Sequence, residues 1–134
     1  PGAEGGTYGG NALACAAAVA TIQVMREERL LENSRARGEQ LMSGLRHLQE
    51  RYSRIGDVRG LGLMVGVEFT HAQGKPDKET AKALQKACLK ERLLLLTCGT
   101  WDNTIRFIPP LVATSEQIND GLARFERALA QVHG

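Results

Sequence analysis

The sequence has little cysteine and few histidines, which argues against two classes of stabilised fold. Its three cysteines, Cys15, Cys88 and Cys98, are an odd number and form no CxxC pair. Neither a disulfide framework nor a zinc site is therefore expected, and the cysteine use fits a reducing, cytoplasmic setting. The three histidines are scattered along the chain, so we expect no metal site.

The sequence also lacks a strong net charge and a long hydrophobic run. The formal net charge is +2, and acidic and basic residues are mixed throughout the chain, so nucleic acid is not an expected partner. The apolar run that begins at Ala12 is interrupted at Thr21 and Gln23, which makes it too short to cross a membrane. With 134 residues, 43% of them hydrophobic and 24% charged, the composition is that of one ordinary globular domain.

Four helices are predicted from hydrophobic periodicity and capping residues. Residues 11–25 are apolar or small on every side, which predicts an alanine-rich helix that is buried all round. A second helix is expected over 27–52, a third over 77–92, and a fourth from the capping-box pair Thr114 and Gln117 onward. The packing stripe of the second helix consists of Leu31, Ser34, Gly38, Leu41, Leu45, Leu48 and Tyr52.

Short extended segments alternate with these helices. Residues 55–59 and 61–69 are expected to be strands joined through Gly60, and residues 93–97 and 104–108 are two more. Glycines on the strand face opposite Val65 and Val67 suggest that a helix, another backbone or a ligand comes close there. The predicted fold class is α+β, a small and mostly antiparallel sheet covered by helices and preceded by the buried alanine-rich helix.

A glycine-rich loop directly precedes the first predicted helix. The stretch EGGTYGG places Gly6, Thr7 and Tyr8 among further glycines, offering backbone N–H groups, a hydroxyl and the positive end of a helix dipole. This combination suits an anion, most naturally a phosphate, although glycine turns before helices are also common as purely structural features. The spacing is not that of a nucleotide-binding P-loop, and Tyr8 suits either stacking on a ligand ring or filling an interface.

Arg106 is the second candidate binding residue. It lies in the segment NTIRFIPP, on the same strand face as Thr104 and Ile108. A guanidinium among apolar neighbours needs an anion, and its planar fork suits a carboxylate. Two partners remain open: a ligand, or an acidic residue of this same domain. None of the five lysines, which all lie between residues 75 and 90, has the desolvated setting that an amine nucleophile needs.

Four motifs in order carry a family resemblance over nearly the whole chain from about Gly5. They are GGTYGGNALACAAA, VRGLGLMVGVEF, LLLLTCGTWDNTIRFIPPL and QINDGLARFERAL. Together they resemble the C-terminal, small-domain part of class III aminotransferases, which depend on pyridoxal 5'-phosphate. Within that class the third motif looks most like the 4-aminobutyrate (GABA) aminotransferases, with acetylornithine and other ω-amino-acid aminotransferases as the nearest alternatives.

The resemblance implies a division of the chain and roles for four residues. Residues 1–26 would be the phosphate-binding loop and an interdomain helix, and residues 27–134 the C-terminal domain of a fold-type I transferase whose large domain is absent. Thr7, with Gly6 and Tyr8, would bind the cofactor phosphate across a homodimer interface. Arg106 would bind the carboxylate of the amino donor or of 2-oxoglutarate.

The implied activity is transfer of an amino group from an ω-amino acid, 4-aminobutyrate above all, to 2-oxoglutarate. The family places its Schiff-base lysine upstream of GGTYGG, in the large domain, so this chain would hold no catalytic residue and would be inactive alone. Two alternatives from another class are a stand-alone anion-binding module and a dimerisation module.

Overall fold

The structure is a computed structural model that describes residues 9–133. Its α-helices are α1 (Ala12–Glu27), α2 (Leu30–Arg51), α3 (Lys78–Lys90) and α4 (Ser115–His133). Its strands are β1 (Ile55–Leu61), β2 (Met64–Phe69), β3 (Leu96–Cys98) and β4 (Thr104–Phe107), and a short 3-10 helix, η1 (Ala72–Gly74), precedes α3.

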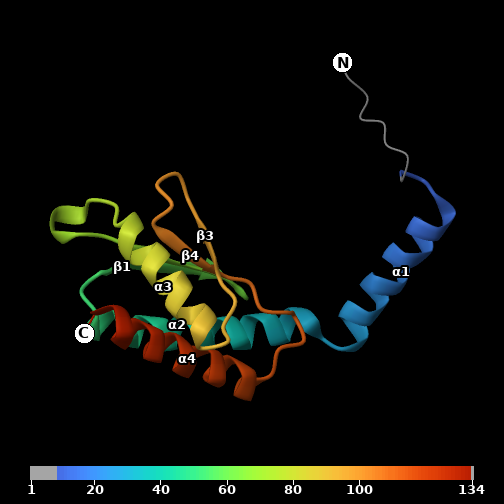
Figure 1. Cartoon of the computed structure of the whole chain (residues 1–134). Coiled ribbons are helices and arrows are strands. Elements are labelled where there is room, and N and C mark those ends of the chain that lie inside the picture. The colour runs from blue at the N-terminus through green and yellow to red at the C-terminus, as the bar shows by residue number, and fades with distance from the viewer. Residues whose placement is uncertain (1–8, 134) are drawn as a thin grey trace.

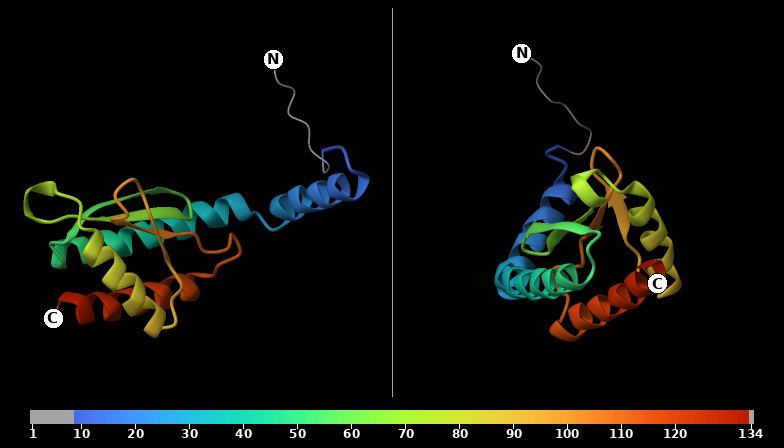
Figure 2. Two further views of the ribbon diagram at one scale, coloured as in Figure 1. Left: turned by 45° about the horizontal axis from the view of Figure 1, so that its top comes forward. Right: turned by 90° about the vertical axis from the view of Figure 1, so that its left-hand side faces the viewer.

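The four strands form one sheet in the order β1-β2-β4-β3, and each neighbouring pair is antiparallel. Helices α2, α3 and α4 form a layer on one face of this sheet (Figures 1 and 2). Within the described part of the chain, no helix or strand covers the opposite face, which we call the open sheet face. The predicted α+β class and the mostly antiparallel sheet are confirmed.

The core lies between the sheet and the helix layer. Val65, Val67 and Phe69 of β2 are almost fully buried, as the strand alternation predicts. Phe107 of β4 meets Phe125 of α4 edge to face, with ring centroids 5.0 Å apart. Burying one such side chain contributes roughly 1.5–3 kcal/mol, so this layer holds the strands in register.

The packing stripe of α2 is confirmed except at its start. Gly38, Leu41, Leu45 and Leu48 are buried, but Leu31 is 65% exposed and Leu30 takes its place. The shift arises because α2 begins one residue after Arg29, whose backbone is left-handed with φ of 52°. The capping box at α4 is confirmed, because Thr114 N donates to Gln117 Oε1 and Gln117 N to Thr114 Oγ1.

The β1–β2 turn lies two residues later than predicted. Strand pairing continues through Leu61 and Met64, so the turn falls at Gly62 and Leu63 rather than at Gly60. Gly62 has φ of +54°, and a Cβ on it would lie 2.5 Å from Ser34 Oγ. A Cβ on Gly38 would lie 2.2 Å from the carbonyl oxygen of Gly62. The expected close approach is found at the β1–β2 turn, where α2 lies against Gly62, but at Gly66, on the open sheet face, no helix within residues 9–133 comes close.

Helix α1 occupies the predicted residues, but its predicted burial is wrong. No residue of α1 is buried, and Leu13, Val19 and Ile22 are 80%, 66% and 53% exposed. Helix α1 projects from the N-terminal end of α2, away from the sheet and the other helices (Figures 1 and 2). Its apolar surface therefore lacks a cover within residues 9–133. None of the helices described is both long and apolar enough to cross a membrane.

Candidate functional site

The open sheet face carries Arg106 in a row of cross-strand neighbours. Arg106 of β4 lies opposite Gly66 of β2 on one side and Leu96 of β3 on the other. Gly66 in turn lies opposite Arg59 of β1. Residues directly opposite each other in antiparallel strands share a face, so two arginines flank a glycine that has no side chain. On its β2 side, the residue directly opposite Arg106 therefore contributes no side chain.

The guanidinium of Arg106 is available to an external anion. Its side chain is exposed, and it makes no hydrogen bond or ion pair with any residue in the described range 9–133. The alternative of an ion pair with an acid of this same domain is therefore not found there. An unpaired guanidinium in a fixed strand position is suited to binding a carboxylate through two parallel N–H donors.

Arg59 differs from Arg106 because it already has partners. Its Nη1 donates to Asp57 Oδ2 and lies 2.8 Å from Glu68 Oε2. The hydrogen bonds with Asp57 and then Glu68 raise the pKa of Arg59, against the opposing effect of burial. The two carboxylates of this part of the face are thus engaged by Arg59.

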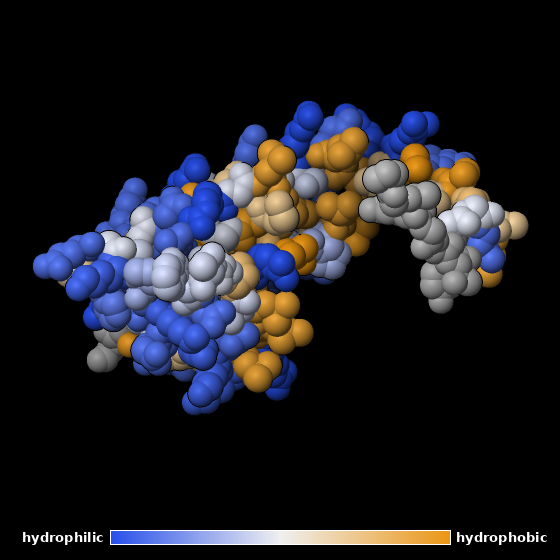
Figure 3. All heavy atoms as spheres, turned by 90° about the horizontal axis from the view of Figure 1, so that it is seen from above, coloured by the Kyte–Doolittle hydropathy of each residue, from blue (hydrophilic) through white to orange (hydrophobic). Residues whose placement is uncertain are grey.

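The rest of the open face near Arg106 is apolar. Met64, Leu96 and Ile108 point to this face and are 60%, 52% and 57% exposed. Hydrophobic atoms gather in the middle of the molecule in the view from above (Figure 3). A cavity of about 260 Å³ lies between the end of the sheet and the helix layer, lined mainly by residues 93–95 and 107–110 and by α4, and Arg106 does not line it. An ion pair formed by Arg106 beneath a further apolar cover would be strengthened by the low local dielectric constant.

The glycine-rich loop is described only at its end. Gly6, Thr7 and Tyr8 lie outside the described residues, so the structure does not place them. Gly10 has φ of +74°, which glycine adopts without strain, and Asn11 caps α1 by accepting from Leu13 N and Ala14 N. The first turn of α1 holds no acidic residue, so this helix end does not repel an anion.

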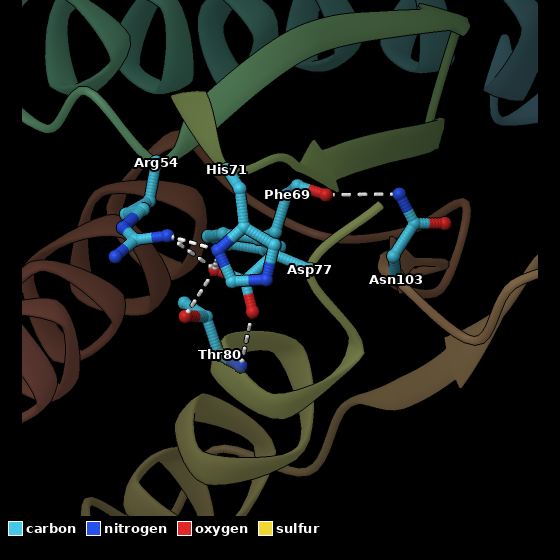
Figure 4. Close-up of polar contacts among 6 residues, drawn as sticks. All are labelled: Arg54, Phe69, His71, Asp77, Thr80 and Asn103. Carbon is cyan, nitrogen blue, oxygen red and sulfur yellow. Dashed lines mark hydrogen bonds and ion pairs between the residues drawn. The ribbon is translucent and has the colours of Figure 1, made fainter. Parts of the chain in front are cut away.

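Sequence reasoning missed a polar cluster around Asp77, which is 1% exposed. Arg54, His71 and Thr80 converge on its carboxylate (Figure 4). Thr80 N donates to Oδ1 at 3.0 Å, and Thr80 Oγ1 and Arg54 Nη1 donate to Oδ2 at 2.7 and 3.0 Å. The spacing of Asp77 and Thr80 is an N-cap signal that could have indicated part of this cluster.

The Asp77 carboxylate is stabilised in its charged form. Burial acts to raise its pKa, but the hydrogen bonds from Thr80 and the charges of His71 and Arg54 outweigh burial and lower the pKa. Next to this cluster, Asn103 Nδ2 donates to the Phe69 carbonyl at 2.9 Å (Figure 4). The cluster joins the end of β2 to the start of α3. It lies at the opposite end of the sheet from Met64 and Ile108, so its role is structural.

Comparison with known proteins supplies the family. The family model described as Aminotransferase class-III matches residues 1–129. The chain is 44% identical over 133 residues to 5-aminovalerate aminotransferase DavT of Pseudomonas putida, covering 98% of this chain and 31% of that protein. The chain belongs to the class III aminotransferase family. The resemblance inferred from the four motifs is confirmed.

Two further proteins that are similar to this class III aminotransferase chain support the same family assignment. It is 38% identical to 4-aminobutyrate aminotransferase GabT of Escherichia coli, over 91% of this chain and 29% of that protein. Its fold matches the crystal structure of acetylornithine aminotransferase from Elizabethkingia anophelis with a TM-score of 0.84 and 37% identity, over 98% of this chain and 33% of that one. The chain thus spans about a third or less of the length of these relatives.

Among residues 9–133 of this class III aminotransferase chain, neither the lysines nor Cys88 has the surroundings of an activated nucleophile. All five lysines are exposed or half-buried, and Lys78 is paired with Asp102 at 2.6 Å. Burial, followed by the charge of Glu91, raises the pKa of the Cys88 thiol to about 12, so this thiol stays protonated. Residues 9–133 hold no group of three or more potential metal ligands.

Proposed function

We propose that the protein carrying this chain transfers an amino group from an ω-amino acid to 2-oxoglutarate, and that Arg106 binds a substrate carboxylate. The observation that carries this proposal is the exposed guanidinium of Arg106, unpaired among the described residues, on a strand whose neighbours are Gly66 and Leu96. The names of the relatives, which act on 5-aminovalerate and 4-aminobutyrate, support an ω-amino acid as donor.

Arg106 contributes positioning rather than bond making. A bidentate, charge-assisted pair with a carboxylate contributes about 1.5–3 kcal/mol, which corresponds to one or two powers of ten in affinity. Because β4 is held between β2 and β3, the backbone that carries Arg106 is fixed, so only the side chain has to be ordered when a carboxylate binds. Both the amino donor and the oxo acid carry a carboxylate, so one arginine serves both half-reactions.

Pyridoxal 5'-phosphate is the proposed cofactor, and when bound it supplies the electron sink for amino-group transfer. The described end of the glycine loop fits a phosphate, since it has a left-handed Gly10 and no acid in the first turn of α1. Asn11 already accepts the N–H groups of Leu13 and Ala14. Phosphate anchoring therefore falls to the residues before Asn11, and Thr7, Gly6 and Tyr8 remain the proposed contacts.

The proposed assembly has three parts. Residues 1–26 form the phosphate-binding loop and interdomain helix, residues 27–134 form the small domain, and a large domain that carries the reactive lysine completes the subunit. The uncovered apolar surface of α1 supports this arrangement, because a large domain and a homodimer partner would bury it. A cytoplasmic location stays a prediction from the cysteine use.

The amino donor is proposed to be a linear ω-amino acid. The third motif favours 4-aminobutyrate, whereas the 44% identity to DavT supports 5-aminovalerate as a second donor. Acetylornithine is the alternative, supported by the fold match to an acetylornithine aminotransferase. Comparing kcat/KM for these three donors in the full polypeptide distinguishes them.

The test of Arg106 is kinetic. In the full polypeptide that carries this chain, Arg106→Met is expected to raise KM for 2-oxoglutarate by about 10- to 100-fold, because the carboxylate loses its charge-assisted pair. Arg35→Met is the matched control, since Arg35 is an exposed arginine of α2 with no recorded partner among the described residues. Unchanged KM values in Arg106→Met would remove Arg106 from the site.

A further inference from the structure

On the open sheet face, Glu68 of β2 lies one row of cross-strand neighbours away from both Arg59 of β1 and Arg106 of β4. On β2, Glu68 pairs with Asp57 of β1 on one side and with Thr104 of β4 on the other. Arg59 and Arg106 each lie one row further along, opposite Gly66. Glu68 is therefore the diagonal neighbour of both arginines, and long side chains reach across such diagonals.

In the structure Glu68 pairs with Arg59 and not with Arg106. Glu68 Oε2 lies 2.8 Å from Arg59 Nη1, and the same Nη1 donates to Asp57. The Glu68 side chain is still 30% exposed, so it has room to take another direction. Gly66 itself has no side chain between Glu68 and Arg106, and the nearest side-chain atom to the position of its missing Cβ is Thr104 Cγ2, at 3.3 Å.

We propose that Arg59 is a positioning residue that keeps Arg106 free for a carboxylate ligand by engaging the neighbouring Glu68. The proposal rests on the proposed function of Arg106. Without Arg59, the nearest cation left to Glu68 on this face is Arg106, and the pair that forms competes directly with the ligand carboxylate for the same N–H donors. Arg59 thus controls the affinity of a site that it does not touch.

The experiment measures the dissociation constant of glutarate, a five-carbon dicarboxylate, for the full polypeptide by calorimetry. Arg59→Met is expected to raise this constant roughly three- to fivefold, the upper part of the range for one competing exposed ion pair. Glu68→Gln, added to Arg59→Met, is expected to restore it to within about twofold, because the competing charge is gone. Arg59→Lys keeps a cation beside Glu68 and is expected to bind as the parent does.

Rescue by Glu68→Gln separates this role from a structural one. If Arg59 merely stabilised the sheet, removing a second member of the same ion-pair cluster would not restore binding. Failure of the rescue, or a glutarate affinity unaltered by Arg59→Met, would overturn the proposal.

Arg106→Met, measured in parallel, separates the two proposals. If Arg106→Met weakens glutarate binding and Arg59→Met does not, the role of Arg59 is wrong and that of Arg106 stands. If neither variant weakens binding, the carboxylate site itself is wrong.

Discussion

At the scale of single residues, two arginines on the open sheet face are in opposite states. Arg59 is paired with two carboxylates, whereas Arg106, two strands away in the same row, has no partner among residues 9–133. The strand alternation predicted the face on which Arg106 lies. The pairing of Arg59 could not be predicted, because it depends on a cross-strand register that is set by the turn at Gly62 rather than at Gly60.

Asp77 carries a prediction about stability at this scale. Asp77→Asn is expected to lower the free energy of unfolding by about 1–3 kcal/mol near neutral pH, because a buried carboxylate hydrogen-bonded to Arg54 and Thr80 is replaced by a neutral amide. Urea unfolding of the chain measures the change. Asp120→Asn, on the exposed surface of α4, is the control and should change little.

The pH dependence of this difference follows from the lowered pKa of Asp77. A carboxyl with a lower pKa in the folded state than in the unfolded state stabilises the fold above its ordinary pKa of about 3.9. That contribution is lost as the pH falls through the folded-state pKa. The gap between parent and Asp77→Asn should therefore close in acid, and a gap that widens there would contradict the assignment.

At the scale of helices and strands, backbone contact between α2 and the β1–β2 turn fixes the start of the sheet. A Cβ on Gly38 would meet the backbone of Gly62 and a Cβ on Gly62 would meet Ser34, so neither glycine tolerates a side chain without movement. The sequence indicated a close approach at these strands from glycine spacing alone. It could not indicate that Leu30 rather than Leu31 is buried, since this depends on the left-handed Arg29 between α1 and α2.

A pair of glycine substitutions in two helices tests this contact. Gly38→Ala is expected to destabilise the chain by about 1–3 kcal/mol, because the new Cβ would lie 2.2 Å from the Gly62 carbonyl oxygen. Gly121→Ala in α4 has open space around its Cβ and is expected to stabilise the chain by up to about 1 kcal/mol. Equal effects of the two substitutions in thermal unfolding would show that the contact is not tight.

At the scale of the whole molecule, the exposed apolar surface is the main departure from the sequence-based expectation. The all-apolar pattern of residues 11–25 predicts burial, yet α1 has no cover among the described residues. The apolar pattern indicates that the helix is suited to a buried environment. The chain spans only about a third of the length of its relatives. Both findings fit a small domain that is completed by further polypeptide.

Self-association of the isolated chain is the expected consequence. Sedimentation velocity at several concentrations should detect dimers or larger species, because apolar side chains of α1 are exposed to water. Substituting Val19 and Ile22 by Lys should weaken association, whereas Leu89→Lys on α3, where Leu89 is also exposed, should not. A chain that stays monomeric at every concentration would contradict this prediction.

The most direct measurement is a crystal structure of the full polypeptide with pyridoxal 5'-phosphate and glutarate bound. We predict a glutarate carboxylate within about 3 Å of the Arg106 guanidinium nitrogens, with Glu68 still paired to Arg59. Glutarate bound at another residue, with Arg106 free in solvent or paired to Glu68, would contradict the assignment of Arg106 as the carboxylate-binding residue.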